Sequence, residues 1–265
     1  MLFHSDWSTA LGNTQRALLD QTKALPWDLV IGNGSTTTVI ASTGLDFPSA
    51  NCLQVNGDYA GAGAQPIQTR QVAVRPMNNR WPVPEVGQSL FFRLYKRLVY
   101  PCPMFPTLGN NNHPLEEQPG GASNWSWSFS VEPAGWRPAL QSQVSTRFRL
   151  GPPSAPIFLA RNVTYRLEWQ VHRIGATTCN LHARIFDSAG ALLHGDAAFV
   201  LDSNPGQSLA TMPTLNLTDV QTLDGLQVGT NGPGVDPGGP TGPMWYLGAV
   251  AVRADGWCGP YANGV

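Results

Sequence analysis

The feature that most constrains this chain is a strict alternation of apolar and polar side chains between residues 163 and 172. The odd positions, from Val163 to Val171, are apolar, and the even positions, from Thr164 to His172, are polar or charged. Successive side chains of a β-strand point to opposite faces of its sheet. The alternation therefore predicts a strand with one face in a core and the other in water.

A second alternating run, residues 180–185, follows a turn signal at 174–178, so the two runs are expected to form a hairpin. The register that places Trp169 beside Ala183 also places Gln170 beside His182 on the opposite face. One face of the hairpin is then apolar, and the other is a polar grid. We expect any ligand contact or chemistry of this sheet to involve the grid residues Arg166, Glu168, Gln170, His172, Asn180, His182 and Arg184.

The rest of the chain is typical of many short strands joined by turns, because it has 28 Gly and 23 Pro and only 12% charged residues. Strands are expected at 28–31, 37–42, 52–56, 70–74, 90–100, 124–131, 146–150, 164–173, 179–187, 197–201, 214–218 and 244–253. The intervals are too short for a helix between each pair of strands. Residues 1–265 are therefore expected to form one all-β domain, an antiparallel two-sheet jelly-roll sandwich. One short helix is expected from Asn13 to Leu25, and long loops at 101–121 and 229–243.

The composition excludes several functional classes. A net charge of −1 gives no basis for nucleic-acid binding. The first residues lack the pattern of a signal peptide, and no window approaches the roughly 18 apolar residues that span a bilayer. We therefore expect a protein made in the cytoplasm, without a membrane partner. No Cys-x-x-Cys motif indicates zinc, and free buried thiols are expected, with disulfides as the alternative, at Cys52, Cys102, Cys179 and Cys258.

Four segments carry a family resemblance: residues 4–10 (HSDWSTA), 165–169 (YRLEW), 182–187 (HARIFD) and 245–252 (WYLGAVAV). Together they resemble concanavalin A-like lectin and glucanase sandwiches of the laminin-G type, across most of the chain. The resemblance implies two stacked antiparallel sheets, with ligands commonly bound on a concave face. Such folds include lectins, hydrolases, polysaccharide lyases and domains that only build virions or cell surfaces, so the fold alone does not choose among them.

Two enzymatic mechanisms were weighed. Glycoside hydrolysis needs paired carboxylates, and none of the five Glu residues has an acidic partner two positions away on a strand. The segment Gln170-Val171-His172 is similar to the Gln-[Ile/Val]-His pattern of jelly-roll alginate lyases. That resemblance implies that Gln170 neutralises a uronate carboxylate and His172 abstracts a proton, with Arg166 or Arg184 nearby. The Tyr-Phe-Lys-Ala-Gly segment of those lyases has no counterpart, so the motifs favour a non-catalytic protein.

Other candidate ligand contacts are aromatic or acidic. Tryptophans near loops or strand ends could stack on sugars, namely Trp81, Trp136, Trp245 and Trp257. Calcium is common in lectins of this fold, and the aspartates in or near turns are Asp58, Asp187, Asp196, Asp202 and Asp236. No Asp-x-Asp-x-Asp-Gly loop supports calcium, so we expect no metal or cofactor.

Three functions remain at this point. The first is a structural virion protein, a sandwich that decorates a bacteriophage capsid or belongs to its tail and can also bind glycans. It would be oligomeric or assembled with other subunits. The second is a lectin-like carbohydrate-binding module that uses the polar grid and the loop tryptophans. The third is a polysaccharide lyase that uses Gln170 and His172.

Overall fold

The computed structural model describes residues 3–7, 12–13, 27–32, 35–57, 72–76, 85–99, 112–116, 126–132, 135–141, 147–216, 228–230 and 242–262. The regular secondary structure of these residues is β-strand apart from one helical element, the short 3-10 helix η1 (Asp196–Ala198). No helix in the described part of the chain is long and apolar enough to cross a membrane.

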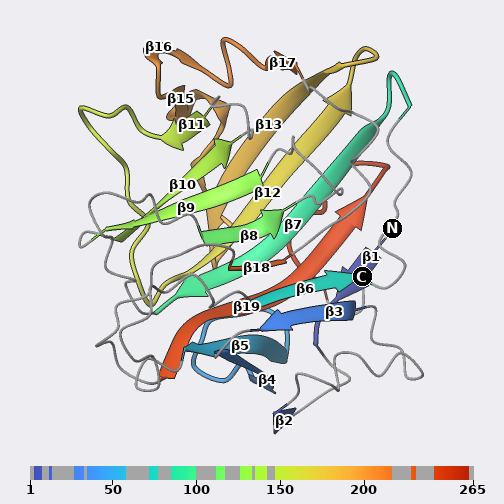
Figure 1. The fold of residues 1–265 in the computed structure, drawn as a ribbon, viewed down its shortest axis with the longest axis vertical. Helices are drawn as coiled ribbons and strands as arrows, with labels where there is room; N and C mark the ends of the chain where they lie inside the picture. Colours follow the sequence, from blue (N-terminus) through green and yellow to red (C-terminus); the bar gives the residue numbers. More distant parts are fainter. Residues whose placement is uncertain are drawn as a thin grey trace.

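The larger sheet has ten antiparallel strands. Its main path is β14 (Leu192–His194), β13 (Thr178–Asp187), β12 (Thr164–Arg173), β7 (Ser89–Leu98), β19 (Gly242–Arg253), β5 (Asn51–Gly57), β4 (Ser35–Ala41) and β2 (Gly12–Asn13). Two further strands are attached to this path, because β1 (Phe3–Ser5) pairs with β19 and β17 (Thr214–Asn216) pairs with β13. The long strands β13, β12, β7 and β19 run side by side through the molecule (Figure 1).

The second layer contains two smaller sheets. The six-stranded one has the order β16 (Asn204–Ser208), β15 (Phe199–Leu201), β11 (Arg147–Leu150), β10 (Gly135–Gln141), β9 (Ser126–Glu132) and β8 (Asn112–Glu116). The three-stranded one has the order β18 (Val228–Thr230), β6 (Val72–Pro76) and β3 (Trp27–Gly32), and β18 lies against β8. Figure 1 shows these strands layered over the large sheet. The predicted antiparallel sandwich is therefore confirmed.

The core lies between the two layers, and the odd residues of β12 point into it. Leu167, Trp169 and Val171 are buried, and the Trp169 ring stacks on Phe92 of β7 with centroids 4.8 Å apart. Phe148 of β11 and Phe199 of β15 contribute from the other layer. Each such side chain stabilises the fold by about 1.5–3 kcal/mol relative to an exposed one, which fixes the face that β12 turns to the core.

Three expectations about the elements need correction or fall outside the described residues. Part of the expected 101–121 loop is a strand, β8, and β10, which contains Pro138, was not among the expected strands. Asn13, the expected helix cap, lies in β2, and residues 14–25 lie outside the described part. In the expected 229–243 loop, β18 and β19 occupy the ends and residues 231–241 lie outside the described part.

Cys52, Cys179 and Cys258 are buried free thiols, as the sequence predicted, and Cys102 lies outside the described residues. Burial raises the pKa of Cys52 to about 11 and that of Cys258 to about 12. The thiolate is the reactive form of cysteine. At about pH 8 we therefore expect iodoacetamide to leave both thiols unmodified in the folded protein and to modify both in urea.

Mass spectrometry of the two cysteine-containing peptides measures this difference. Equal alkylation of Cys258 in the folded and unfolded protein would contradict the buried position described for its side chain.

Candidate functional site

The β12–β13 hairpin has the register that the sequence predicted. Trp169 pairs with Ala183, Gln170 with His182 and Glu168 with Arg184. On the other side of β12, Gln170 pairs with Phe91 and Glu168 with Arg93 of β7. The polar grid thus belongs to one continuous polar face on β7, β12 and β13, opposite the core.

The C-terminal segment 254–262, here called the C-terminal strap, follows β19 and covers one half of this polar face. The carbonyl oxygen of Gly259 accepts a hydrogen bond from Arg93 Nη1 at 3.2 Å, and the backbone N–H of Tyr261 donates to Tyr95 Oη at 2.9 Å. The Trp257 ring packs edge-on against Phe91, with centroids 5.5 Å apart. These contacts define a closed half of the face, beneath the strap, and an open half beside it.

The closed half holds a buried charge cluster. Glu168 is 1% exposed, and its Oε1 lies 3.2 Å from Nε of Arg166, which is 5% exposed. Arg93 is 1% exposed. Arg166 and Glu168 were expected to face water or a ligand, and no prediction was made for Arg93. The structure corrects that expectation, because the strap and Phe186, whose ring centroid lies 3.8 Å from the Arg166 guanidinium carbon, shield them.

Burial also changes the acidity of this cluster. It raises the pKa of Glu168, an effect that the positive charges of Arg166, Arg93 and Arg184 oppose. It lowers the pKa of Arg93, against the charge of Glu168. The cluster is thus part of the folded framework that holds the strap.

The open half is built around Ser89, the first residue of β7. Its Oγ lies 2.9 Å from Nδ1 of His172, and the side-chain amide Nε2 of Gln170 donates to the same oxygen at 2.9 Å. Gln170 and His172 lie two residues apart on β12, so they share a face, and His172 pairs with Ser89 across the ladder. All three side chains are partly exposed.

The neighbouring strand β13 completes the open half. His182 Nδ1 lies 2.7 Å from Oδ2 of Asp196, whose Oδ1 accepts a hydrogen bond from the backbone N–H of Ala183 at 2.6 Å. Asn180 Oδ1 accepts a hydrogen bond from the hydroxyl of Thr214 at 2.8 Å. Every one of these polar groups is oriented by a partner, so the open half is a preorganised surface.

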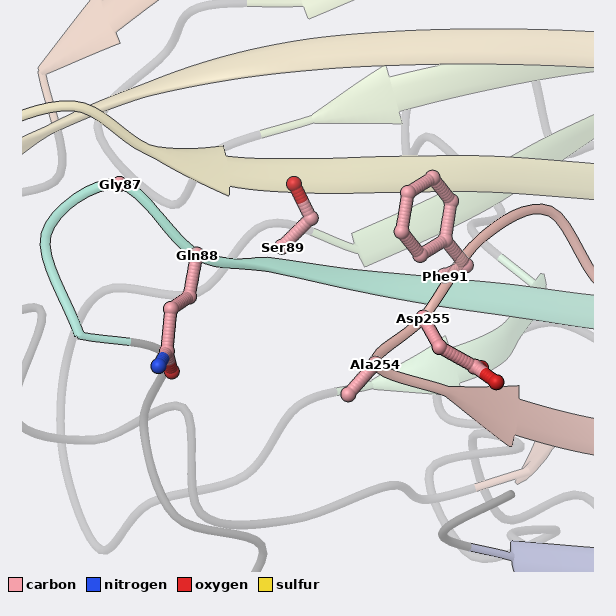
Figure 2. A pocket seen from close by; sticks show the side chains of 6 residues that line it. All are labelled: Gly87, Gln88, Ser89, Phe91, Ala254 and Asp255. Carbon is pink, nitrogen blue, oxygen red and sulfur yellow. The ribbon is translucent and has the colours of Figure 1, made fainter.

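A hollow of about 450 Å³ adjoins this surface at the edge between β7 and the start of the strap. Its lining residues are Gly87, Gln88, Ser89, Phe91, Ala254 and Asp255. Figure 2 shows Ser89 and Phe91 on one side of β7, with Ala254 and Asp255 on the segment that leaves β19. Asp255 is paired with Arg253 at 2.9 Å. The hollow extends the open half by roughly the space of a small ligand.

Two of the four tryptophans suggested for sugar stacking are buried in the core. Trp136 and Trp245 are 0% and 1% exposed and lie in the core, so they cannot stack on a ligand. Trp257 is partly exposed at the border of the open half, but the Arg184 guanidinium carbon lies 3.8 Å from its ring centroid. Trp81 lies outside the described residues.

Ser89 was not named from the sequence, and Asp196 was named only as a calcium candidate and not as a partner of His182. A signal for Ser89 existed, because the odd positions of β7, from Ser89 to Arg97, alternate with the mostly apolar even ones. Asp196 had no such signal as a partner of His182, because it reaches that residue from η1, across β14. A contact of this kind depends on the path of the chain and not on local pattern.

The described residues hold no group of three or more metal-binding side chains. The turn aspartates considered for calcium have other partners: Asp187 accepts from the backbone N–H of Ala191 at 2.8 Å, and Asp202 pairs with Arg149 at 3.0 Å. Asp196 is engaged by His182 and Ala183. Asp58 and Asp236 lie outside the described residues.

Comparison with known proteins supports the fold. No protein-family model matches the chain, and no curated protein matches it. Among solved structures, the cellulose-induced protein Cip1 is similar at a TM-score of 0.54, with 12% identity over 98% of this chain and 100% of that chain. An endo-β-1,4-glucuronan lyase from the fungus Trichoderma reesei (TM-score 0.48, 13% identity, 95% of this chain and 94% of that chain) is also similar.

A third similar structure is the catalytic domain of a glycoside hydrolase family 131 protein from Coprinopsis cinerea (TM-score 0.46, 14% identity, 86% of this chain and 81% of that chain). The likeness to Cip1 shows a shared fold. The chain is a jelly-roll sandwich, consistent with the concanavalin A-like fold that the sequence resembles.

Proposed function

We propose that this protein binds carbohydrate on the open half of the polar face of its ten-stranded sheet. The observation that carries the proposal is the set of partly exposed polar side chains, from β7, β12 and β13, that are held in place by hydrogen bonds to one another or to Asp196 and Thr214. Sugar hydroxyls both donate and accept hydrogen bonds. A rigid surface of alternating donors and acceptors binds them without the entropic cost of ordering its own side chains.

The same geometry gives no support to glycoside hydrolysis. That reaction needs two carboxyl groups on either side of the scissile bond. On the described open half, both oxygens of the Asp196 carboxylate accept hydrogen bonds from β13. Asp255, at the hollow, is paired with Arg253.

A polysaccharide lyase is the second candidate, because Gln170 and His172 do share one exposed face. Arg166 does not join them, since it is buried against Phe186 and Glu168. Arg184 packs on Trp257. A lyase would therefore have to use Gln170 and His172 with the smaller polar groups of the open half.

The virion role remains a separate prediction, supported by the sequence composition. A decoration protein that also binds glycans would use the same open half. Its distinguishing behaviour is assembly with other subunits.

The decisive experiment incubates the purified chain with neutral and acidic polysaccharides and measures both co-sedimentation and newly formed unsaturated chain ends. We expect retention without new chain ends. His172→Ala and Asn180→Ala should each weaken retention about five- to tenfold, the value of about one hydrogen bond, with an unchanged melting temperature.

The matched control is His194→Ala on β14, outside the open half, which should retain glycan like the unmodified chain. Unsaturated ends that vanish in His172→Ala would establish the lyase instead. No retention by any polysaccharide, together with assembly into particles, would favour the virion role.

A further inference from the structure

We propose that His172 and His182 are held in opposite tautomers, so that the open half offers one fixed donor and one fixed acceptor. Such a pair selects a ligand with two adjacent hydroxyl groups, as on a neutral sugar ring. This inference rests on the proposed carbohydrate binding and names the ligand class of the same site. It follows from the direction of each hydrogen bond around the two imidazoles.

Gln170 sets the direction of the hydrogen bond between Ser89 and His172. An amide Nε2 can only donate, so the hydroxyl oxygen of Ser89 accepts its hydrogen bond at 2.9 Å. Ser89 has one hydroxyl proton, which it can donate to Nδ1 of His172, 2.9 Å from its oxygen. Nδ1 is then the unprotonated nitrogen, and the neutral ring carries its proton on Nε2. His172 thus presents an N–H donor at the far edge of its ring.

The direction at His182 is the reverse. The Asp196 carboxylate can only accept, and its Oδ2 lies 2.7 Å from Nδ1 of His182, so Nδ1 carries the proton. The backbone N–H of Ala183 holds the other carboxylate oxygen at 2.6 Å, which fixes the orientation of Asp196. Nε2 of the neutral ring is then an acceptor. The carboxylate partner thereby determines the tautomer, because the hydrogen bond made by one ring nitrogen fixes the protonation of the other.

The two rings belong to one surface. His172 pairs with Asn180, and His182 is two residues further along β13, so the histidines are diagonal neighbours on the same face. Diagonal neighbours in an antiparallel ladder are about 7–8 Å apart. Two hydroxyls on adjacent ring carbons, each within hydrogen-bond reach of one imidazole, can bridge a separation of this size.

Donor and acceptor together discriminate among ligands. A hydroxyl pair can accept from Nε2–H of His172 with one oxygen and donate to Nε2 of His182 with the other. A carboxylate has no proton to donate, so it would leave the His182 acceptor without a partner. Leaving a site's polar group unsatisfied is the stronger source of specificity in binding. At this position the pair therefore favours two adjacent hydroxyls over a carboxylate.

The same tautomer argues against elimination at this site. A general base needs an available lone pair directed at the substrate. In His172 the lone pair is on Nδ1 and is engaged by Ser89, whereas Nε2 carries the proton. Gln170 and Ser89 are thus positioning residues that orient His172 as a donor.

Long-range proton–nitrogen correlation NMR at neutral pH measures the tautomers directly. Loss of signals in His172→Gln and His182→Gln assigns the two rings. We expect the Nε2–H tautomer for His172 and the Nδ1–H tautomer for His182 within one spectrum. An Nδ1–H tautomer at His172, or a doubly protonated His182, would overturn the inference.

The Gln170→Glu variant tests whether the hydrogen bond from Gln170 to Ser89 sets the tautomer of His172. A carboxylate at residue 170 accepts from Ser89, so Ser89 must accept from Nδ1–H of His172, and the tautomer should reverse. Asn204→Asp on β16, which changes the charge equally but lies in the other sheet, is the matched control and should leave the His172 tautomer unchanged. A His172 tautomer that ignores Gln170→Glu would contradict the role of the Gln170–Ser89 chain.

Binding measurements with three kinds of sugar test the ligand class. They are neutral oligosaccharides, deoxy analogues of these that lack one hydroxyl of the adjacent pair, and uronate oligomers. Removal of one hydroxyl should weaken binding about tenfold. Failure of every sugar to bind would overturn the proposed function even with the expected tautomers. Preference for uronates would overturn the ligand class while leaving carbohydrate binding in place.

Discussion

Trp136→Ala is expected to lower the free energy of unfolding by about 3–5 kcal/mol, the usual cost of removing a fully buried tryptophan. The side chain is 0% exposed, and its Nε1–H donates to the carbonyl oxygen of Ala160 at 3.1 Å. Its ring packs edge-on against Tyr165, whose hydroxyl oxygen accepts from the backbone N–H of Ala160 at 2.9 Å. The truncation would leave a cavity, and it would remove the hydrogen bond to Ala160 and the ring contact with Tyr165.

Urea unfolding measures this loss, and Trp257→Ala is the matched control. Trp257 is partly exposed and packs on the polar face, so its removal should cost less than half as much. A Trp136→Ala variant with unchanged stability but lost glycan retention would contradict the core position and return Trp136 to a ligand role.

Gly135→Ala is expected to destabilise the protein by about 3 kcal/mol through backbone strain and lost hydrogen bonds. Gly135 has a φ of 149°, a region that favours glycine. A methyl group there would overlap the carbonyl oxygen of Leu159. Leu159 forms a β-bridge with Trp136, the residue after Gly135. Its carbonyl accepts from the Trp136 N–H at 3.0 Å, and its own N–H donates to the Trp136 carbonyl at 2.8 Å.

Gly195→Ala is the matched control, since Gly195 has an extended backbone and no atom within 4 Å of an added methyl. It should change stability by less than about 1 kcal/mol. Equal melting temperatures for the two variants would show that the contact between β10 and Leu159 adds nothing to the fold.

The predicted hairpin was correct in register because its two runs alternate strictly, and a slip by one residue would turn Trp169 and Leu167 out of the core. The same logic missed β10, in which Pro138 interrupts the usual strand composition, and placed Trp136 near a loop. Trp136 is buried because β10 pairs with β9 and bridges to Leu159. The β9–β10 pairing is a local hairpin, but the bridge to Leu159 joins a separate segment of the chain, and no local pattern encodes it.

The polar grid shows the same division between what the local pattern predicts and what tertiary contacts decide. Its membership on one face followed from the two-residue period of β12 and β13, and all seven residues do lie on that face. The sequence could not show that the C-terminal strap covers Arg166 and Glu168 and leaves Gln170, His172 and His182 accessible. The strap follows β19, and only the pairing of β19 with β7 brings it over Arg93 and Phe91.

The amino-acid sequence by itself determined the class of fold, the β12–β13 register and which side chains turn away from the core. These follow from the alternation of side chains along a strand, which is a local property. The tertiary structure decided which part of the polar face is open, which tryptophans are buried, and which partners orient each histidine. Those outcomes depend on strand order and on contacts between segments that are distant in the sequence. Such contacts form only when the whole chain folds, so no local pattern encodes them.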